Sequence, residues 1–573
     1  MGVITARTAG FCWGVRRAVD MVLAALREGD EPYAVYGELV HNPQVLEALA
    51  GRGVGICGDP ASMEGGTLFL RTHGTTLEKM RELSGLPLKI RDLTCPRVGR
   101  VLSLAGKKAA EGYDVVILGD PGHQEVKCIV SYGGPGAVVV RGPEDVERLD
   151  DLKKPFLLSQ TTQNTEVWEE TRRRMVRRFP GLEWSRTICG STDRRQEELR
   201  KLCGRVDCVV VVGGKNSANT ARLVEIAREE GLPAFHVETH EDMDPDKLGK
   251  YGEILLTAGA STPSWSIRKV RERLLEIQGS LGTGRARRFL GNCVFGNFHV
   301  LPVAFVLAAA GACVMKIEEW FMPALASSLF LFAAHLLNSV LESGYSHPSR
   351  LGRQEFLRRH RTLFTLLAVA AFAGSLAVSF FLPMPWPVLL VMMLLVFLLY
   401  SLPLVRNGNP PGGLRNLPGS RDLIFAGAWS FLLAIVPGFV YGGFESGTVL
   451  WAAMLFFLFL GRGLLADLVD LRGDALMGMD TIPIHAGRER SVMFFWGCVV
   501  VTLLLLAFGV LSGELEASMS WFAAGPLALA AGYVLLGLVP FPSEQAKRAA
   551  ADGSLLLAGL LPVLARSLGG IRC

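Results

Sequence analysis

The sequence predicts a soluble α/β domain made of three α/β units, followed by an all-α membrane domain. The first reason is charge: 81 of the first 288 residues are charged, but only 32 of the remaining 285. The second is hydrophobic patterning. Short apolar runs alternate with amphipathic segments in the first half, whereas apolar stretches of bilayer length fill the second. We therefore expect a soluble domain at 1–278, a linker at 279–292 and a membrane domain at 293–573.

Composition excludes several classes of protein. The 59 Lys and Arg against 54 Asp and Glu give a net charge of +5, which is too even to suggest nucleic-acid binding. Eleven irregularly spaced cysteines are too sparse for a disulfide framework and fit a reducing compartment. We expect no signal peptide at the start, because Arg16, Arg17 and Asp20 interrupt the region where its apolar core would lie.

The alternation in the first half predicts layered α/β structure with largely parallel sheets. Buried strands are expected at 33–36, 114–118, 208–212 and 253–256, and helices at 16–26, 165–178 and 218–230. Glycine-rich segments such as 119–122 and 213–214 follow predicted strands. Functional loops are therefore expected at the carboxyl ends of the strands, where folds of this class bind ligands.

Three cysteines have surroundings that set them apart. Cys12 lies in Gly-Phe-Cys-Trp-Gly, Cys95 in Thr-Cys-Pro and Cys189 in Ile-Cys-Gly-Ser. Their separations of 83 and 94 residues suggest one cysteine from each α/β unit, unlike the clustered ligands of a ferredoxin or a zinc knuckle. Each cysteine taken alone is more often a buried structural thiol.

Polar loops after the predicted strands favour a functional role, rather than a structural one, for these cysteines. They contain three histidines, one carboxylate and several hydroxyl and amide donors, at 41–43, 71–74, 122–126, 159–162, 215–219 and 257–261. Hydrogen-bond donors of these types suit an anionic ligand such as a diphosphate. We expect the loops to form one anion-binding pocket.

The ordered set His-Asn-Pro, Thr-Cys-Pro, Gly-His-x-Glu-Val, Gln-Thr-Thr, Lys-Asn-Ser and Ala-Gly-Ala-Ser resembles the LytB family of 4-hydroxy-3-methylbut-2-enyl diphosphate reductases across about residues 1–275. These enzymes catalyse the last step of the non-mevalonate isoprenoid pathway and yield isopentenyl and dimethylallyl diphosphates. The resemblance implies three α/β units around a central [4Fe–4S] cluster. Reduced ferredoxin or flavodoxin would supply the electrons.

The resemblance also implies a role for each matching residue. Cys12, Cys95 and Cys189 would hold the cluster and leave one iron open to the substrate hydroxyl. Glu125 would deliver a proton. Substrate would be bound by His41, His73, His123, Thr161, Ser217, Asn219 and Ser261. A different class of function, an iron–sulfur electron-transfer or sensor protein, stays open, although pure electron transfer needs no diphosphate pocket.

The second half has nine apolar stretches of about 17–22 residues, close to the length that a bilayer demands. They lie at 298–315, 320–340, 362–382, 386–404, 422–441, 447–465, 492–512, 520–540 and 553–570. Arginine and lysine collect in the even-numbered loops, whereas the odd-numbered loops contain only Lys316. This asymmetry predicts a multi-pass protein of the inner (cytoplasmic) membrane with the N-terminal domain in the cytoplasm.

Three aspartates stand at the end of the sixth stretch. Asp467, Asp470 and Asp474 are spaced by three and four residues, which places them on one face of a helix. Carboxylates at membrane depth indicate a functional site, and Mg²⁺ bridging a diphosphate is their natural use. A solvated loop face is the plain alternative.

These aspartates resemble the second aspartate-rich motif of the UbiA prenyltransferase superfamily, whose members have nine transmembrane helices. Asn338 and Glu342 fall where the first motif would lie, although Ser346 replaces one of its aspartates. The resemblance implies a Mg²⁺ and diphosphate site, a prenyl diphosphate substrate and a lipophilic acceptor within the membrane lipid. A non-catalytic anchor that binds prenyl lipids remains the alternative.

Overall fold

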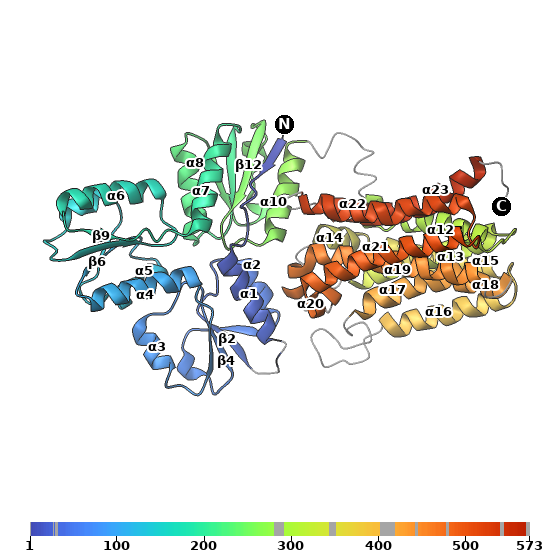
Figure 1. The fold of residues 1–573 in the computed structure, drawn as a ribbon, viewed down its shortest axis with the longest axis horizontal. Helices are drawn as coiled ribbons and strands as arrows, with labels where there is room; N and C mark the ends of the chain where they lie inside the picture. Colours follow the sequence, from blue (N-terminus) through green and yellow to red (C-terminus); the bar gives the residue numbers. More distant parts are fainter. Residues whose placement is uncertain are drawn as a thin grey trace. The chain divides into compact units, whose positions relative to one another are not determined.

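The computed structural model describes residues 2–26, 28, 32–279, 292–342, 351–401, 419–441, 445–476, 481–538 and 544–568. The chain divides into two compact units, Met1–Leu281 and Gly282–Cys573 (Figure 1). Most of the linker predicted at 279–292 lies outside the described residues.

The first unit contains three four-stranded sheets, and every pairing in them is parallel. The first sheet has the order β1 (Gly2–Thr5), β12 (Glu253–Ala258), β10 (Cys208–Val212), β11 (Ala234–Val237). The second has the order β3 (Val54–Cys57), β2 (Tyr33–Tyr36), β4 (Thr67–Leu70), β5 (Lys89–Asp92). The third has the order β7 (Val138–Val140), β6 (Asp114–Leu118), β8 (Pro155–Ser159), β9 (Glu183–Trp184). The predicted parallel α/β class is confirmed.

Helices connect these strands. They are α1 (Trp13–Ala25), α2 (Pro43–Ala50), α3 (Leu77–Leu83), α4 (Pro96–Ala110), α5 (Gln124–Gly133), α6 (Thr165–Arg178), α7 (Gly190–Cys203), α8 (Ala218–Glu229), α9 (Pro245–Leu248) and α10 (Ser264–Ile277). The central strands are continuous apolar runs, and all five residues of β10 are buried, as expected for a sheet covered by helices on both faces. The strands and helices named in the sequence analysis are all present.

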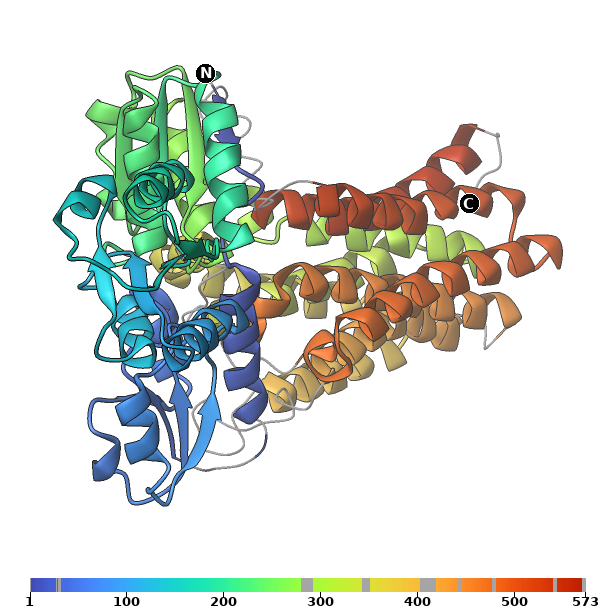
Figure 2. The ribbon, with the colours of Figure 1, turned by 60° about the vertical axis from the view of Figure 1, so that its left-hand side comes forward.

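In the described part of the second unit, the regular structure is all helical. Its helices are α12 (Val300–Val314), α13 (Phe321–Glu342), α14 (Leu351–Arg359), α15 (Arg361–Ser379), α16 (Pro385–Ser401), α17 (Ser420–Ser430), α18 (Val436–Tyr441), α19 (Ser446–Leu476), α20 (Ile482–Ala486), α21 (Arg488–Leu511), α22 (Ala524–Leu538) and α23 (Glu544–Leu568). The long helices lie side by side as a bundle (Figure 1, Figure 2). A π-helical turn, Phe431–Ile435, joins α17 to α18.

Seven of the described helices are long and apolar enough to cross a membrane. They are Phe321–Leu341, Arg361–Ser379, Ser420–Tyr441, Ser446–Val469, Arg488–Leu511, Ala517–Leu538 and Ala546–Leu568. Two shorter apolar helices, Val300–Val314 and Pro385–Tyr400, coincide with the remaining two predicted stretches. The total of nine spans therefore stays a prediction.

The bundle is packed inside and apolar outside. Trp386 and Trp451 are fully buried, whereas large apolar side chains such as Leu366 and Leu504 are more than half exposed. Such an apolar surface suits contact with lipid rather than water. Gly311 allows α12 to approach α19, since a Cβ there would stand within 3.0 Å of the Trp451 indole ring.

Candidate functional site

The three predicted cysteines occupy equivalent positions in the three sheets of the first unit. Each follows an edge strand, β1, β5 or β9, and each is the N-cap residue of the next helix: Cys12 for α1, Cys95 for α4 and Cys189 for α7. Each donates its backbone N–H to a carbonyl after the neighbouring strand of its own sheet. The acceptors are Ala260, Thr72 and Thr161, at 2.9, 3.0 and 2.9 Å respectively.

The other predicted site residues follow the inner strands in the same repeated order. The second strand of each sheet, β12, β4 or β8, leads to Ser261, His73 or Thr161. The third strand, β10, β2 or β6, leads to Ser217 and Asn219, to His41, or to His123 and Glu125. All these residues and the three cysteines line one cavity with about 690 Å³ of empty space.

Three histidines form one wall of the cavity. His41 and His73 stack with ring centroids 4.4 Å apart, and His123 stands edge-on to both, at 5.8 and 5.6 Å. Burial lowers the pKa of His73 well below its usual value and that of His123 to about 4. His73 Nδ1 is buried without a hydrogen-bond partner. An anion placed among these rings would supply that partner and favour their protonation.

Serine and asparagine side chains form the opposite wall. Ser217 is buried at the N-cap of α8, so the positive end of that helix lies beside the cavity. Asn219 Oδ1 accepts from Thr192 Oγ1 at 3.3 Å, and Ser261 Oγ donates to the His41 carbonyl at 3.2 Å. Because Ser261 follows β12 and His41 follows β2, the second of these bonds joins the first sheet to the second beside the cavity.

Glu125 is held by one residue. Its carboxylate oxygens accept from the Thr161 backbone N–H at 2.6 Å and from Thr161 Oγ1 at 2.9 Å. Burial raises the pKa of Glu125 to about 7, although both bonds from Thr161 act to lower it. Because the Thr161 carbonyl also accepts from the Cys189 backbone N–H, this threonine fixes the Glu125 carboxyl relative to Cys189.

The helical unit has its own polar cavity, with about 1200 Å³ of empty space. Of the five predicted residues here, Asn338 and Asp467 line it, and Asp467 pairs with Arg421. Glu342 lies on the last turn of α13, and Asp470 and Asp474 lie on α19, but the side chains of these three fall outside the described residues.

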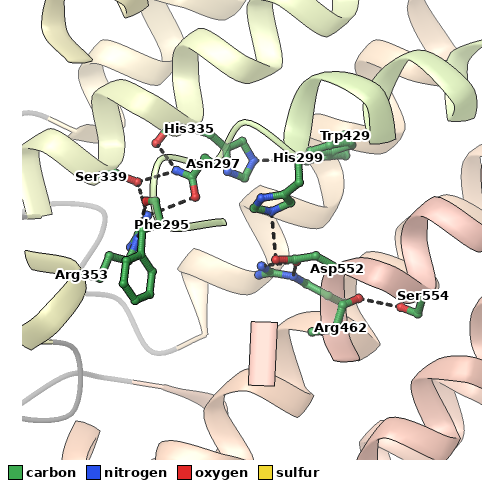
Figure 3. Close-up of polar contacts among 11 residues, drawn as sticks. Phe295, Asn297, His299, His335, Ser339, Arg353, Trp429, Arg462, Asp552 and Ser554 are labelled. Atoms are coloured by element: carbon green, nitrogen blue, oxygen red, sulfur yellow. Dashed lines mark hydrogen bonds and ion pairs between the residues drawn. The ribbon is translucent and has the colours of Figure 1, made fainter. Parts of the chain in front are cut away.

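A histidine, an aspartate and an arginine from three helices meet in this cavity (Figure 3). Asp552 on α23 accepts from Arg462 on α19, at 2.9 and 2.7 Å, and its other oxygen lies 2.9 Å from Nε2 of His299. The reasoning from sequence missed this cluster. The sequence offered one signal: Asp552 directly precedes the apolar stretch 553–570 and follows Lys547 by five residues.

Comparisons with known proteins agree with the geometry of the first unit. The model of the LytB protein family matches residues 3–275. A Geobacter sp. (strain M21) 4-hydroxy-3-methylbut-2-enyl diphosphate reductase is 40% identical over 278 residues, which are 48% of this chain and 98% of that protein. The chain belongs to the LytB family.

Two solved structures are similar to the two halves. The E-1-hydroxy-2-methyl-but-2-enyl-4-diphosphate reductase from Plasmodium falciparum is 29% identical, with a TM-score of 0.46, over 48% of this chain and 87% of that one. A UbiA homologue from Aeropyrum pernix K1 is 14% identical, with a TM-score of 0.36, over 48% of this chain and 97% of that one.

The thiols of the LytB unit fit a polynuclear cluster better than a single ion. In the described residues, no three His, Cys, Asp or Glu side chains are close enough to hold one metal ion. The three thiols instead border one cavity, each at a helix N-terminus, where the helix dipole favours negative charge. Cys12 Sγ already accepts from the Val15 N–H at 3.4 Å.

Arg195 is a further site residue that was not predicted. It is buried on α7 and donates to the Gly10 carbonyl and to Ser191. Burial lowers the pKa of its guanidinium, while Cys12 and Cys189 act to raise it. The buried positions 192, 195, 196, 199 and 203 of α7 follow a helical period, which was the signal that could have revealed this cation.

Gly14 is required by the position of Cys95. A Cβ at residue 14 would lie 2.5 Å from Cys95 Sγ, and overpacking of this kind typically costs about 1–3 kcal/mol. We expect Gly14→Ala to displace that thiol and to remove most iron from anaerobically purified protein, as measured by iron content and visible absorbance.

Gly99→Ala is the matched control, because the nearest atom to its Cβ would be Thr94 Cγ2 at an ordinary 3.9 Å. It should retain iron like the wild type. Equal iron in Gly14→Ala and Gly99→Ala would contradict the assigned role of Gly14.

Proposed function

We propose that residues 1–278 reduce 4-hydroxy-3-methylbut-2-enyl diphosphate to isopentenyl and dimethylallyl diphosphates. The observation that carries this proposal is that three thiols, three histidines and a buried carboxyl border one cavity. Cys12, Cys95 and Cys189 would hold a [4Fe–4S] cluster. Reduced ferredoxin or flavodoxin is the proposed electron donor.

The proposed chemistry breaks the allylic C–O bond, takes up two electrons and two protons, and releases water. A bound cluster would supply Lewis acidity at its open iron and transfer electrons one at a time. The protein residues position the substrate and move its protons. His41, His73 and His123 would donate to the diphosphate from one wall, and Ser217, Asn219 and Ser261 from the other.

Glu125 is the proposed proton donor. A carboxyl with a pKa of about 7 keeps its proton near neutral pH and can still release it. Thr161 would hold Glu125 in position through its backbone N–H and its hydroxyl. The nearly complete burial of Glu125 limits exchange with bulk water. An electron-transfer or sensor protein would have no use for this arrangement of proton carrier and anion donors.

For the second unit we propose a membrane prenyltransferase that alkylates a lipophilic acceptor. Asn338, Glu342, Asp467, Asp470 and Asp474 would bind prenyl diphosphate with Mg²⁺. Asn338 and Asp467 lie on one cavity among basic residues, which supports this proposal. The proposed setting is the inner membrane, with residues 1–278 in the cytoplasm. The alternative of a non-catalytic anchor predicts no prenyl diphosphate binding.

Substitution of a cavity cysteine is expected to have a different effect from substitution of Cys57. Replacing Cys12, Cys95 or Cys189 by Ser should abolish the visible absorbance of the anaerobic protein, because each would remove one thiolate ligand. Cys57→Ser is the control, because Cys57 is buried within β3, away from the cavity residues. Full absorbance in all three variants would refute the cluster assignment.

For Glu125→Gln we expect the cluster and substrate binding to be retained while kcat falls on the order of 10²-fold or more. The amide preserves shape but carries no transferable proton. Burial raises the pKa of Glu125, so its proton is present below about pH 7 and lost as the pH rises through that value. The wild-type rate should therefore decline above about pH 7. Steady-state rates across pH will measure this, and turnover by Glu125→Gln close to wild type would exclude Glu125 as the donor.

Asp467→Asn should abolish Mg²⁺-dependent binding of a prenyl diphosphate and leave reductase activity unchanged. Asparagine keeps one oxygen but lacks the charge on which a hard cation depends. Equilibrium binding of labelled geranyl diphosphate, with Mg²⁺ and with EDTA, measures the effect. Failure of the wild type to bind under either condition would favour the anchor.

A further inference from the structure

The His299, Asp552 and Arg462 cluster lies outside both aspartate-rich segments. It joins the residue before α12 to the middle of α19 and the first turns of α23, in the cavity that also contains Asn338 and Asp467. Asp552 is nearly fully buried. Charged residues at membrane depth are costly, so a network of three on three helices calls for a function.

Asp552 lies between Arg462 and His299. Arg462 donates twice to one oxygen of Asp552 and so favours the ionised carboxylate. Nε2 of His299 lies 2.9 Å from the second Asp552 oxygen, which is an ion-pair distance, and that oxygen makes no hydrogen bond to the described residues. Arg462 therefore balances the charge of Asp552.

The other ring nitrogen of His299, Nδ1, has no partner among the residues that the structure describes. His299 Nδ1 is buried and makes no hydrogen bond, although His299 is among the residues that line the cavity. A buried polar atom without a partner is destabilising, and a ligand that donates a hydrogen bond to it would recover that free energy. A histidine oriented by an aspartate, with its other nitrogen available, is the arrangement of a general base.

The remaining walls favour an aromatic ligand. Phe425, Trp429 and Phe459 line the same cavity, and the Trp429 and Phe459 ring centroids are 4.3 Å apart. Trp429 is held in place because its Nε1 donates to His335 Nε2 at 3.2 Å (Figure 3). His335 and Arg548 also interact electrostatically with the cluster, and Arg353 acts on His335.

We propose that His299 is the proton acceptor for a hydroxylated aromatic substrate bound against Trp429 and Phe459, with Asp552 and Arg462 as positioning residues. This inference rests on the proposed prenyl transfer. In that step the C–O bond of the prenyl diphosphate breaks and diphosphate leaves with the electron pair. The acceptor supplies the pair for the new bond, and the proton that it loses goes to His299 Nδ1.

The test separates proton acceptance from prenyl transfer. The full-length protein in lipid nanodiscs is titrated with 4-nitrophenol, whose phenolate absorbs visible light, in a buffer acidic enough to keep the free probe protonated. We expect wild type to produce bound phenolate. His299→Gln should lose that signal, because the amide can still donate to Asp552 but cannot take up a proton. Asp552→Asn should weaken the signal.

His360→Gln is the matched control, since His360 bonds to the Phe356 carbonyl and is not among the residues lining the cavity. It should behave like the wild type. With geranyl diphosphate added, His299→Gln should lower kcat on the order of 10²-fold and leave the prenyl diphosphate KM unchanged. Absence of phenolate in the wild type, or equal phenolate in His299→Gln, would overturn the proposal. If the wild type forms bound phenolate but does not bind geranyl diphosphate, the result would refute the proposed prenyl transfer and not the role of His299 as a proton acceptor.

Discussion

Parallel strands release their loops at one edge of each sheet, and in the LytB unit the three such edges border one cavity. Each sheet presents a cysteine from its edge strand and donors or acceptors from the next two strands. The cysteine N–H bonds to the neighbouring loop lock these positions within each sheet. A shift in any one sheet would move a thiol and its neighbouring donors together, so the geometry of the whole site depends on how the three sheets pack.

The same convergence determines the electrostatics of the cavity. Three thiols stand at helix N-termini, burial raises the pKa of the Cys95 thiol, and the buried guanidinium of Arg195 acts on Cys12 and Cys189. Burial and the neighbouring imidazoles lower the pKa of His73 and of His123, so the charge of these two rings depends on an arriving anion. The burial that keeps Glu125 protonated therefore also makes the binding wall responsive to a diphosphate.

Local signals made much of this predictable. Strands such as Cys208–Val212 are unbroken apolar runs, and each cysteine loop joins a strand to a helix, so the sequence pattern alone located them. Contacts across large sequence separations were not predictable. The paired bonds from Thr161 to Glu125 and the clearance that Gly14 gives Cys95 depend on how the sheets pack. In the helical unit, His299, Arg462 and Asp552 are isolated in sequence, and only helix packing brings them together.

The two cavities differ in how they would meet an anion. The lining of the LytB cavity combines histidine, serine, threonine and asparagine side chains with Arg97. The cavity in the helical unit is lined by arginines and a lysine, with Asp467 and Asp552 each engaged by an arginine. Ion pairs at membrane depth tolerate the loss of a partner poorly, because the remaining charge has no water to solvate it. An anion that entered that cavity would therefore meet arginines that are already paired, Arg421 with Asp467 and Arg462 with Asp552.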